Sequence, residues 1–230
     1  MDTVTSSGGM VVAPHMAAAR AGAEILAEGG SAIEAMIAAA AAIAVVYPHM
    51  NGIGGDGFWL IAPPGEDPKV IAACGPAGSG ATIAAYNRAG HDTVPARGPL
   101  AALTVAGTVG GWQKAYEAAA SLGGRMPRRD LLSAAITHAK DGITVSRSQA
   151  HLTAEKLAEL EAQPGFAPVF LKDGKAPEAG DVIRQERLAD TLDHLAVAGF
   201  DDFYRGDVGA SIADDLERIG APVTKGDLER

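Results

Sequence analysis

Residues 47–61 read YPHMNGIGGDGFWLI, a glycine-rich stretch between two segments of different character. Gly52, Gly54 and Gly57 have the G-x-G-x-x-G spacing that surrounds a pyrophosphate in dinucleotide-binding proteins. Such a loop follows a strand and precedes a helix, so that the phosphate meets the free N–H groups of the helix. Here the order is reversed, because the residues before the loop are helical in pattern and those after it are strand-like. We therefore expect no nucleotide site, and glycines that permit a tight turn and close backbone packing.

The segment before the loop is predicted to be a buried helix. Ser31 and Glu34 form a capping box at its start, and Pro48 ends it. Residues 35–47, AMIAAAAAIAVVY, are almost entirely Ala, Ile and Val, so nearly every side of the helix should be covered. The run is shorter than the roughly 20 residues that a membrane span needs, and no basic segment precedes an apolar one at the N-terminus. We expect no membrane partner.

The segments around this helix predict an α/β chain. Residues 10–13 (MVVA) look like a short strand, and a helix over residues 15–28 follows, with Pro14 at its first position. After the loop, residues 58–62 and 69–74 predict the two strands of a hairpin around a PPGEDP turn. No repeat or linker composition divides the chain, so a single domain is expected. Further helices, each closed by a glycine, are predicted within residues 112–124, 127–142, 146–165, 184–199 and 207–220.

The charge balance and the cysteine count narrow the classes of partner. The chain of 230 residues has 28 acidic and 19 basic residues, a formal charge of -9, which would repel a nucleic acid or an anionic membrane. With Cys74 as its single cysteine it cannot form an internal disulfide or a multi-cysteine zinc site, which suits a reducing cytoplasm. The histidines are scattered and none forms an H-x-x-x-H pair, so we expect no metal and no cofactor.

No catalytic set emerges from the residue patterns themselves. The sequence contains neither a G-x-S-x-G elbow nor an S-x-x-K motif. Cys74 could act as a thiol nucleophile, but a cysteine at a strand end is more often a small buried hydrophobe, and we prefer that interpretation. Asn51 and Asp56 are the polar residues of the glycine loop. Both residue types favour turns, so we expect a structural role for them in preference to substrate contact.

Five ordered motifs cover nearly all of the chain: residues 10–61, 103–127 (LTVAGTVGGWQKAYEAAASLGGRMP), 135–150 (AITHAKDGITVSRSQA), 201–220 (DDFYRGDVGASIADDLERIG) and 223–230 (VTKGDLER). In this order and spacing they resemble the N-terminal region of the γ-glutamyltranspeptidase family. The resemblance implies an α/β fold, the four-layer αββα sandwich of the N-terminal-nucleophile hydrolases, to which this chain supplies mainly helices and a few strands. It also implies that residues 1–230 are the N-terminal portion of one such domain, incomplete at the C-terminus.

The resemblance implies the chemistry as well. Members of the family are made as a precursor that cuts itself into a large N-terminal and a small C-terminal subunit. The threonine that opens the small subunit is the nucleophile, and its own α-amine is the general base. This chain resembles the earlier part of the large subunit, so we expect no catalytic residue in it and a C-terminal small subunit as its partner. Thr224 and Asp227 look like the start of a helix that Arg230 cuts short, which also predicts a longer protein.

Cys74 is the candidate substrate-binding position, and it is where the sequence departs from the family. An arginine of the family, in a D-F-R-E-like segment before an A-T-R motif, holds the α-carboxylate of the γ-glutamyl group. Aligning Ala81-Thr82 with that motif places Cys74 at the arginine, and a thiol cannot make the paired charge-assisted hydrogen bonds of a guanidinium. Arg88 or Arg97 could take over that role. The departure favours a small-molecule amide other than γ-glutamyl, such as oxamate, as in oxamate amidohydrolase-like or acylase-like members.

Two other functions stay open. A true γ-glutamyl transferase or glutathione hydrolase would turn over a γ-glutamyl anilide in spite of Cys74. A truncated or scaffold homologue would lack the nucleophile and be inactive. The sequence shows no signal peptide, whereas bacterial transpeptidases are commonly exported, so we expect a cytoplasmic protein, or a periplasmic one if a signal peptide has been removed.

Overall fold

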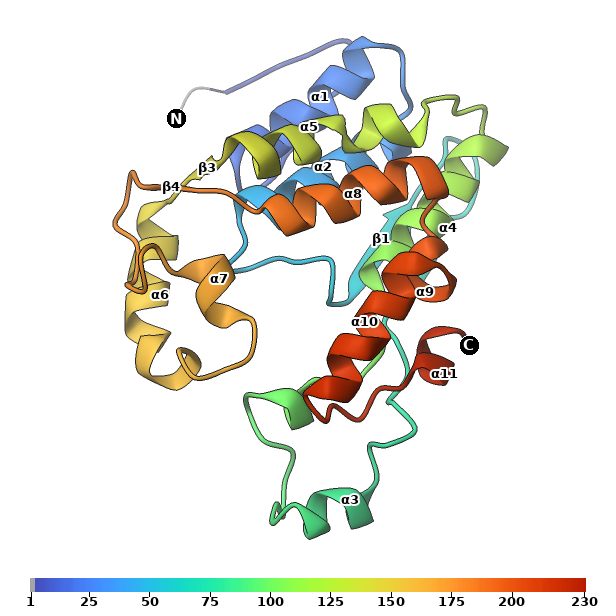
Figure 1. Ribbon diagram of the computed structural model, residues 1–230. Helices are drawn as coiled ribbons and strands as arrows, with labels where there is room; N and C mark the ends of the chain where they lie inside the picture. Colours follow the sequence, from blue (N-terminus) through green and yellow to red (C-terminus); the bar gives the residue numbers. More distant parts are fainter. Residues whose placement is uncertain (1–2) are drawn as a thin grey trace.

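The computed structural model describes residues 3–230, in which helices predominate and the strands form two antiparallel pairs (Figure 1). Helix α2 (Ala32–Val46) packs against α1 (Met16–Ala27) and α5 (Arg128–Asp141), and α5 packs against α8 (Glu186–Ala198). The remaining elements are β1 (Gly57–Ile61), β2 (Lys69–Ala73), α3 (Ile83–Arg88), the 3₁₀ helix η1 (Pro99–Ala101), α4 (Thr108–Ser121), β3 (Ile143–Thr144), α6 (Arg147–Leu160), α7 (Phe166–Phe170), β4 (Val182–Ile183), α9 (Asp202–Arg205), α10 (Asp207–Arg218) and α11 (Lys225–Leu228).

Helix α2 forms as predicted and is buried on nearly all sides. The Ser31 hydroxyl accepts a hydrogen bond from the N–H of Glu34 (3.3 Å), and the Glu34 carboxylate accepts one from the N–H of Ser31 (2.7 Å), which is the reciprocal pair of a capping box. The helix ends before Pro48. No helix in residues 3–230 is long and apolar enough to cross a membrane. The apolar core extends from α1 to α9, and its largest fully buried side chains are Ile37, Val45, Val109, Trp112, Leu131, Leu132, Val145, Leu192, Leu195 and Phe200.

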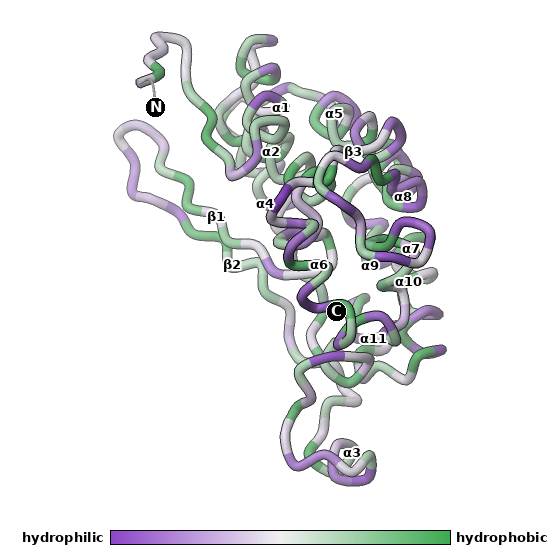
Figure 2. Tube along the Cα trace, turned by 90° about the vertical axis from the view of Figure 1, so that its left-hand side faces the viewer, coloured by the Kyte–Doolittle hydropathy of each residue, from purple (hydrophilic) through white to green (hydrophobic). Residues whose placement is uncertain are grey.

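Strands β1 and β2 form the predicted hairpin, and its two faces differ. Trp59 and Ile71 pair across the strands and pack against the helical core on the side of α4. The opposite face carries Phe58, Leu60 and Val70, which are 70%, 73% and 70% exposed. Figure 2 shows the hairpin extending away from the helices, with hydrophobic residues along its strands. One face of this sheet therefore covers the core, while the other is apolar and uncovered in the described part of the chain.

Residues 10–13 are not a strand, contrary to the prediction. Two of their side chains are more than half exposed, and the segment pairs with no strand in the described part of the chain. A strand needs a neighbour for its backbone N–H and C=O groups, and apolar side chains alone do not supply one. Pro14 lies before the first helix and not at its first position. His15 is the N-cap, because its Nδ1 accepts a hydrogen bond from the N–H of Ala17 (3.2 Å).

Helices α5 and α8 end at the predicted glycines, whereas α6 ends at Leu160, with Glu161 as its cap, and not at a glycine. Helix α5 is capped by Gly142 and α8 by Gly199, each with φ of 104°, a conformation that favours glycine. Helix α4 begins at Thr108, earlier than predicted, so that Gly111 falls inside it. A Cβ on Gly111 would lie 3.0 Å from the indole Nε1 of Trp59, so this glycine allows the hairpin to approach the helix closely. The short elements α3, α7, α9, β3 and β4 were not predicted, because so few residues carry no clear periodicity.

Candidate functional site

The glycine loop is held against the start of α4. The carbonyl oxygen of Gly55 accepts hydrogen bonds from the N–H of Gly107, the N–H of Thr108 and the Thr108 hydroxyl, each at 2.9 Å. A Cβ added at Gly52 or Gly54 would meet no atom within 4 Å, and neither residue has a positive φ. The predicted turn forms at residues 53–54, but the prediction of close backbone packing is wrong for Gly52 and Gly54. The close approach occurs at Gly107 instead, where a Cβ would overlap the backbone of β2.

Asn51 and Asp56 share a small cavity of about 180 Å³ beside the loop. Trp112 lies in its wall, and both polar residues are exposed. The N–H of Asn51 donates to the carbonyl of Tyr47 (3.1 Å), which closes the turn after α2. Neither side chain makes a hydrogen bond within residues 3–230, so the local side-chain bonding typical of turn residues is not observed.

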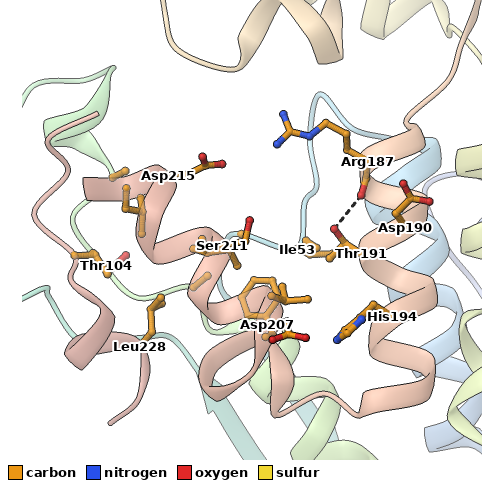
Figure 3. A pocket seen from close by; sticks show the side chains of 18 residues that line it. Ile53, Thr104, Arg187, Asp190, Thr191, His194, Asp207, Ser211, Asp215 and Leu228 are labelled. Carbon is orange, nitrogen blue, oxygen red and sulfur yellow. Dashed lines mark hydrogen bonds between the residues drawn. The ribbon is translucent and has the colours of Figure 1, made fainter. Parts of the chain in front are cut away.

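A cavity of about 570 Å³ lies between α8 and α10, with Ile53 and Gly54 of the glycine loop in its wall (Figure 3). Phe203 and Leu228 belong to its apolar part. Carboxylates outnumber cations on its rim, which disfavours an anionic ligand. No group of three His, Cys, Asp or Glu in the described part of the chain could hold a metal ion. The polar side chains of the cavity are Thr104, Arg187, Asp190, Thr191, His194, Asp207, Ser211 and Asp215.

Polar groups at this larger cavity bond mainly to the backbone. The Thr191 hydroxyl donates to the carbonyl of Arg187 (2.9 Å; Figure 3). Asp202 Oδ1 accepts a hydrogen bond from the N–H of Val208 (3.0 Å) and lies 3.1 Å from His194 Nε2. Burial acts to raise the pKa of the Asp202 carboxyl, but these hydrogen bonds hold that pKa below its ordinary value. The contacts thus stabilise the start of α10 and do not activate a nucleophile.

A third cavity, of about 290 Å³, lies beside Cys74. Cys74 follows the last paired residue of β2 and is exposed, so the prediction of a buried cysteine is wrong. Side chains alternate along a strand, and position 74 therefore points to the same side as the exposed Ala72, away from the helical core. Arg88 is exposed on α3 and Arg97 pairs with Glu159 (2.8 Å), and neither arginine lines this cavity.

Three cations from separate elements line the cavity beside Cys74. They are Lys114 on α4, Arg205 on α9, and Arg230 after α11. Lys114 pairs with Glu117 (2.9 Å) and Arg205 with Asp201 (2.6 Å), and the side chains of both pairs are exposed. Sequence reasoning missed these residues because each lies in a different one of the quoted motifs, and the three meet only when α9 and α11 fold beside the hairpin.

Tyr204 fixes the wall of this cavity. Its hydroxyl donates a hydrogen bond to the carbonyl of Ala106 (2.8 Å) and accepts one from the N–H of Gly110 (2.7 Å). Burial raises the pKa of the Tyr204 hydroxyl, which keeps it neutral and able to donate. Ala106 and Leu228 line both this cavity and the one between α8 and α10, so the two cavities adjoin.

Asp227 joins the C-terminal helix to the loop after β2. Its Oδ2 accepts hydrogen bonds from the N–H (2.9 Å) and hydroxyl (2.9 Å) of Ser79, and from the N–H (2.8 Å) and hydroxyl (2.8 Å) of Thr224. Burial acts to raise the pKa of this carboxyl, but the hydrogen bonds hold the pKa far below its ordinary value. The predicted pairing of Thr224 with Asp227 is confirmed as a capping box, and it also holds the distant Ser79.

Comparison with known proteins finds relatives over almost the whole chain. The family model described as gamma-glutamyltranspeptidase matches residues 18–230. The chain is 56% identical over 225 residues to the oxamate amidohydrolase proenzyme of Klebsiella pneumoniae, a match that covers 97% of this chain and 42% of that protein. It is 38% identical over 221 residues to the glutathione hydrolase-like YwrD proenzyme of Bacillus subtilis, covering 96% of this chain and 41% of that protein.

The arrangement of helices and strands agrees with these matches. The crystal structure of the γ-glutamyltranspeptidase of Helicobacter pylori superposes with a TM-score of 0.88 at 29% identity, covering 99% of this chain and 65% of that chain. The chain spans less than half the length of the two curated relatives. On the matched residues, the identity and the shared α/β architecture, the chain belongs to the γ-glutamyltranspeptidase family.

Proposed function

We propose that this chain is the N-terminal part of an amide hydrolase or acyltransferase whose substrate is a small amide other than γ-glutamyl, with oxamate as the first candidate. The observation that carries the proposal is the 56% identity, over 97% of the chain, with an oxamate amidohydrolase proenzyme. Cys74 supports it as well. At the position where the family resemblance implies an arginine, the chain has an exposed cysteine beside an open cavity, and a thiol cannot bind a carboxylate through two charge-assisted hydrogen bonds.

The proposed reaction is acyl transfer through a covalent intermediate. A threonine outside residues 1–230, at the start of a small subunit, attacks the carbonyl carbon while its α-amine accepts the hydroxyl proton. The C–N bond then breaks, and the leaving nitrogen takes up that proton. Water attacks the resulting ester and releases the acid, or an amine accepts the acyl group. For oxamate and water the products are oxalate and ammonia.

The exposed apolar face of the hairpin is an argument that the whole protein contains a further sheet packed against it. Phe58, Leu60 and Val70 lie side by side on it and are each at least 70% exposed. Burying a large apolar side chain contributes about 1.5–3 kcal/mol, so an apolar sheet face of this kind marks a contact surface. In a four-layer αββα sandwich such a face packs against a second sheet about 10 Å away. The proposal is that the rest of the protein, with the small subunit that carries the threonine, supplies that sheet.

The substrate preference of the intact protein tests the proposal. Ammonia release from oxamate and anilide release from a γ-glutamyl anilide are measured on the same preparation. The control is a variant in which the threonine that opens the small subunit is replaced by alanine, and it should be inactive on both substrates. Turnover of the anilide without turnover of oxamate, in a protein that still has Cys74, would overturn the preference.

A glutathione hydrolase is the second candidate. The observation in its favour is the 38% identity with the glutathione hydrolase-like YwrD proenzyme. It predicts the reverse preference, with the γ-glutamyl anilide as the better substrate. A non-catalytic scaffold predicts no turnover of either compound.

A further inference from the structure

We infer that Arg205 and Lys114 bind the carboxylate of the amide substrate in the cavity beside Cys74, an inference that rests on the proposed function. The chain as a whole is acidic, with a formal charge of -9. Within the described residues, however, this cavity of about 290 Å³ is lined by Lys114, Arg205 and Arg230 against one acidic side chain, Asp227. Positive charge gathered on one cavity of an acidic protein attracts an anionic ligand.

Asp227 and Arg230 satisfy each other and are not available to a ligand. Oδ2 of Asp227 accepts four hydrogen bonds from Ser79 and Thr224, and Oδ1 contacts the guanidinium of Arg230. The Asp227 side chain is also almost fully buried. The charges of this pair cancel, which leaves Lys114 and Arg205 as the net positive charge of the cavity.

Lys114 and Arg205 are free to exchange their present partners for a ligand. The Lys114 and Arg205 side chains are 65% and 46% exposed, and their partners Glu117 and Asp201 are 50% and 66% exposed. Neither Glu117 nor Asp201 lines the cavity. Exposed ion pairs of this kind contribute little to stability, so a carboxylate in the cavity can replace them at small cost.

The chemistry of the two cations fits a small amide that carries a carboxylate close to the scissile bond. A guanidinium presents parallel N–H groups to both oxygens of a carboxylate, and an ammonium adds a second point of charge. In oxamate the carboxylate is bonded directly to the amide carbon, so holding the carboxylate also positions the carbonyl that is attacked. The adjoining cavity of about 570 Å³ has the opposite charge balance and does not suit this anion.

Oxamate binding to the intact protein tests the inference. Isothermal titration calorimetry is done on the form whose nucleophile threonine is replaced by alanine, so that no turnover occurs. In that background Arg205→Gln should weaken oxamate binding by about 10- to 100-fold, the effect of losing a charge-assisted pair. Lys114→Gln should weaken it less, because an ammonium makes fewer directed bonds. Arg97→Gln is the matched control: Arg97 is 47% exposed, is paired with Glu159 and lies outside the cavity, and its replacement should change nothing.

A neutral analogue separates charge recognition from a general loss of structure. Oxamide has an amide in place of the carboxylate, so Arg205→Gln should leave its binding unchanged. The inference would be overturned if the Arg205→Gln and Arg97→Gln forms bound oxamate with equal affinity, or if Arg205→Gln lost equal affinity for oxamate and oxamide. It would also be overturned if the parent form did not bind oxamate. If the protein hydrolyses oxamate and Arg205→Gln does not change that rate, the proposed function holds and the inference about Arg205 fails. Arginine-dependent binding without hydrolysis of any amide would instead count against the proposed function.

Discussion

Glu34 is predicted to be the most sensitive single carboxylate of the helical core. It is 1% exposed, and its two oxygens accept hydrogen bonds from the N–H of Ser31 and the N–H of Met126, each at 2.7 Å. Glu34→Ala leaves two partly buried N–H groups without a partner, at about 1–3 kcal/mol each, so the free energy of unfolding should fall by about 4 kcal/mol. Urea denaturation of the intact protein at pH 7, followed by circular dichroism, measures the loss.

The pH dependence of the stability of Glu34→Ala tests whether the lost hydrogen bonds to the carboxylate cause the destabilisation. Burial acts to raise the pKa of the Glu34 carboxyl, but the hydrogen bonds from Ser31 and Met126 lower it overall. A carboxyl with a lowered folded-state pKa stabilises the protein above its unfolded pKa, about 4.3, and loses that contribution as the pH falls through the folded value. The difference in the free energy of unfolding between the parent protein and Glu34→Ala should therefore decrease below about pH 4. The control Glu117→Ala removes an exposed carboxylate and should cost less than about 1 kcal/mol. A loss from Glu34→Ala no larger than that of this control would refute the reasoning.

Two further changes test the packing. Gly107→Ala should lower the free energy of unfolding by more than about 2 kcal/mol, because its Cβ would overlap the backbone of β2. The control Gly54→Ala should be neutral, because a Cβ there meets no atom within 4 Å. Thermal unfolding compares the two variants, and equal midpoints would contradict the close approach of Gly107 to β2. If a second sheet covers the hairpin, Val70→Lys should destabilise the intact protein by about 2 kcal/mol. The control is Val197→Lys on α8, where the valine is equally 70% exposed, and it should not destabilise the protein. Equal effects of the two variants would count against the second sheet.

Local features were predictable from the sequence because their causes lie within a few residues. The Ser31–Glu34 capping box and the glycine caps at Gly142 and Gly199 each depend on the spacing of two positions or on one backbone conformation. The hairpin followed from two apolar runs around a turn. The short strand over residues 10–13 was wrong because a strand depends on a partner, which the local sequence cannot reveal.

The site was less predictable because its residues come from distant parts of the chain. Lys114, Arg205 and Arg230 share a cavity with Cys74 only through the packing of α4, α9 and α11 beside β2. The exposure of Cys74 could not be predicted from residues 69–74, KVIAAC, because their one polar residue, Lys69, shares a strand face with Ile71 and not with Cys74. Arg88, by contrast, looked closer in sequence and lies on α3, away from that cavity.

The central claim is that this family member acts on a small amide that carries a carboxylate and not on a γ-glutamyl group. Its most direct test is the ratio of kcat/KM for oxamate to kcat/KM for a γ-glutamyl anilide, measured on the intact, processed protein. We predict a ratio above about 100, the discrimination expected when a site lacks a charge-assisted pair that one substrate requires. A ratio below one, with the exposed Cys74 unchanged, would contradict the claim.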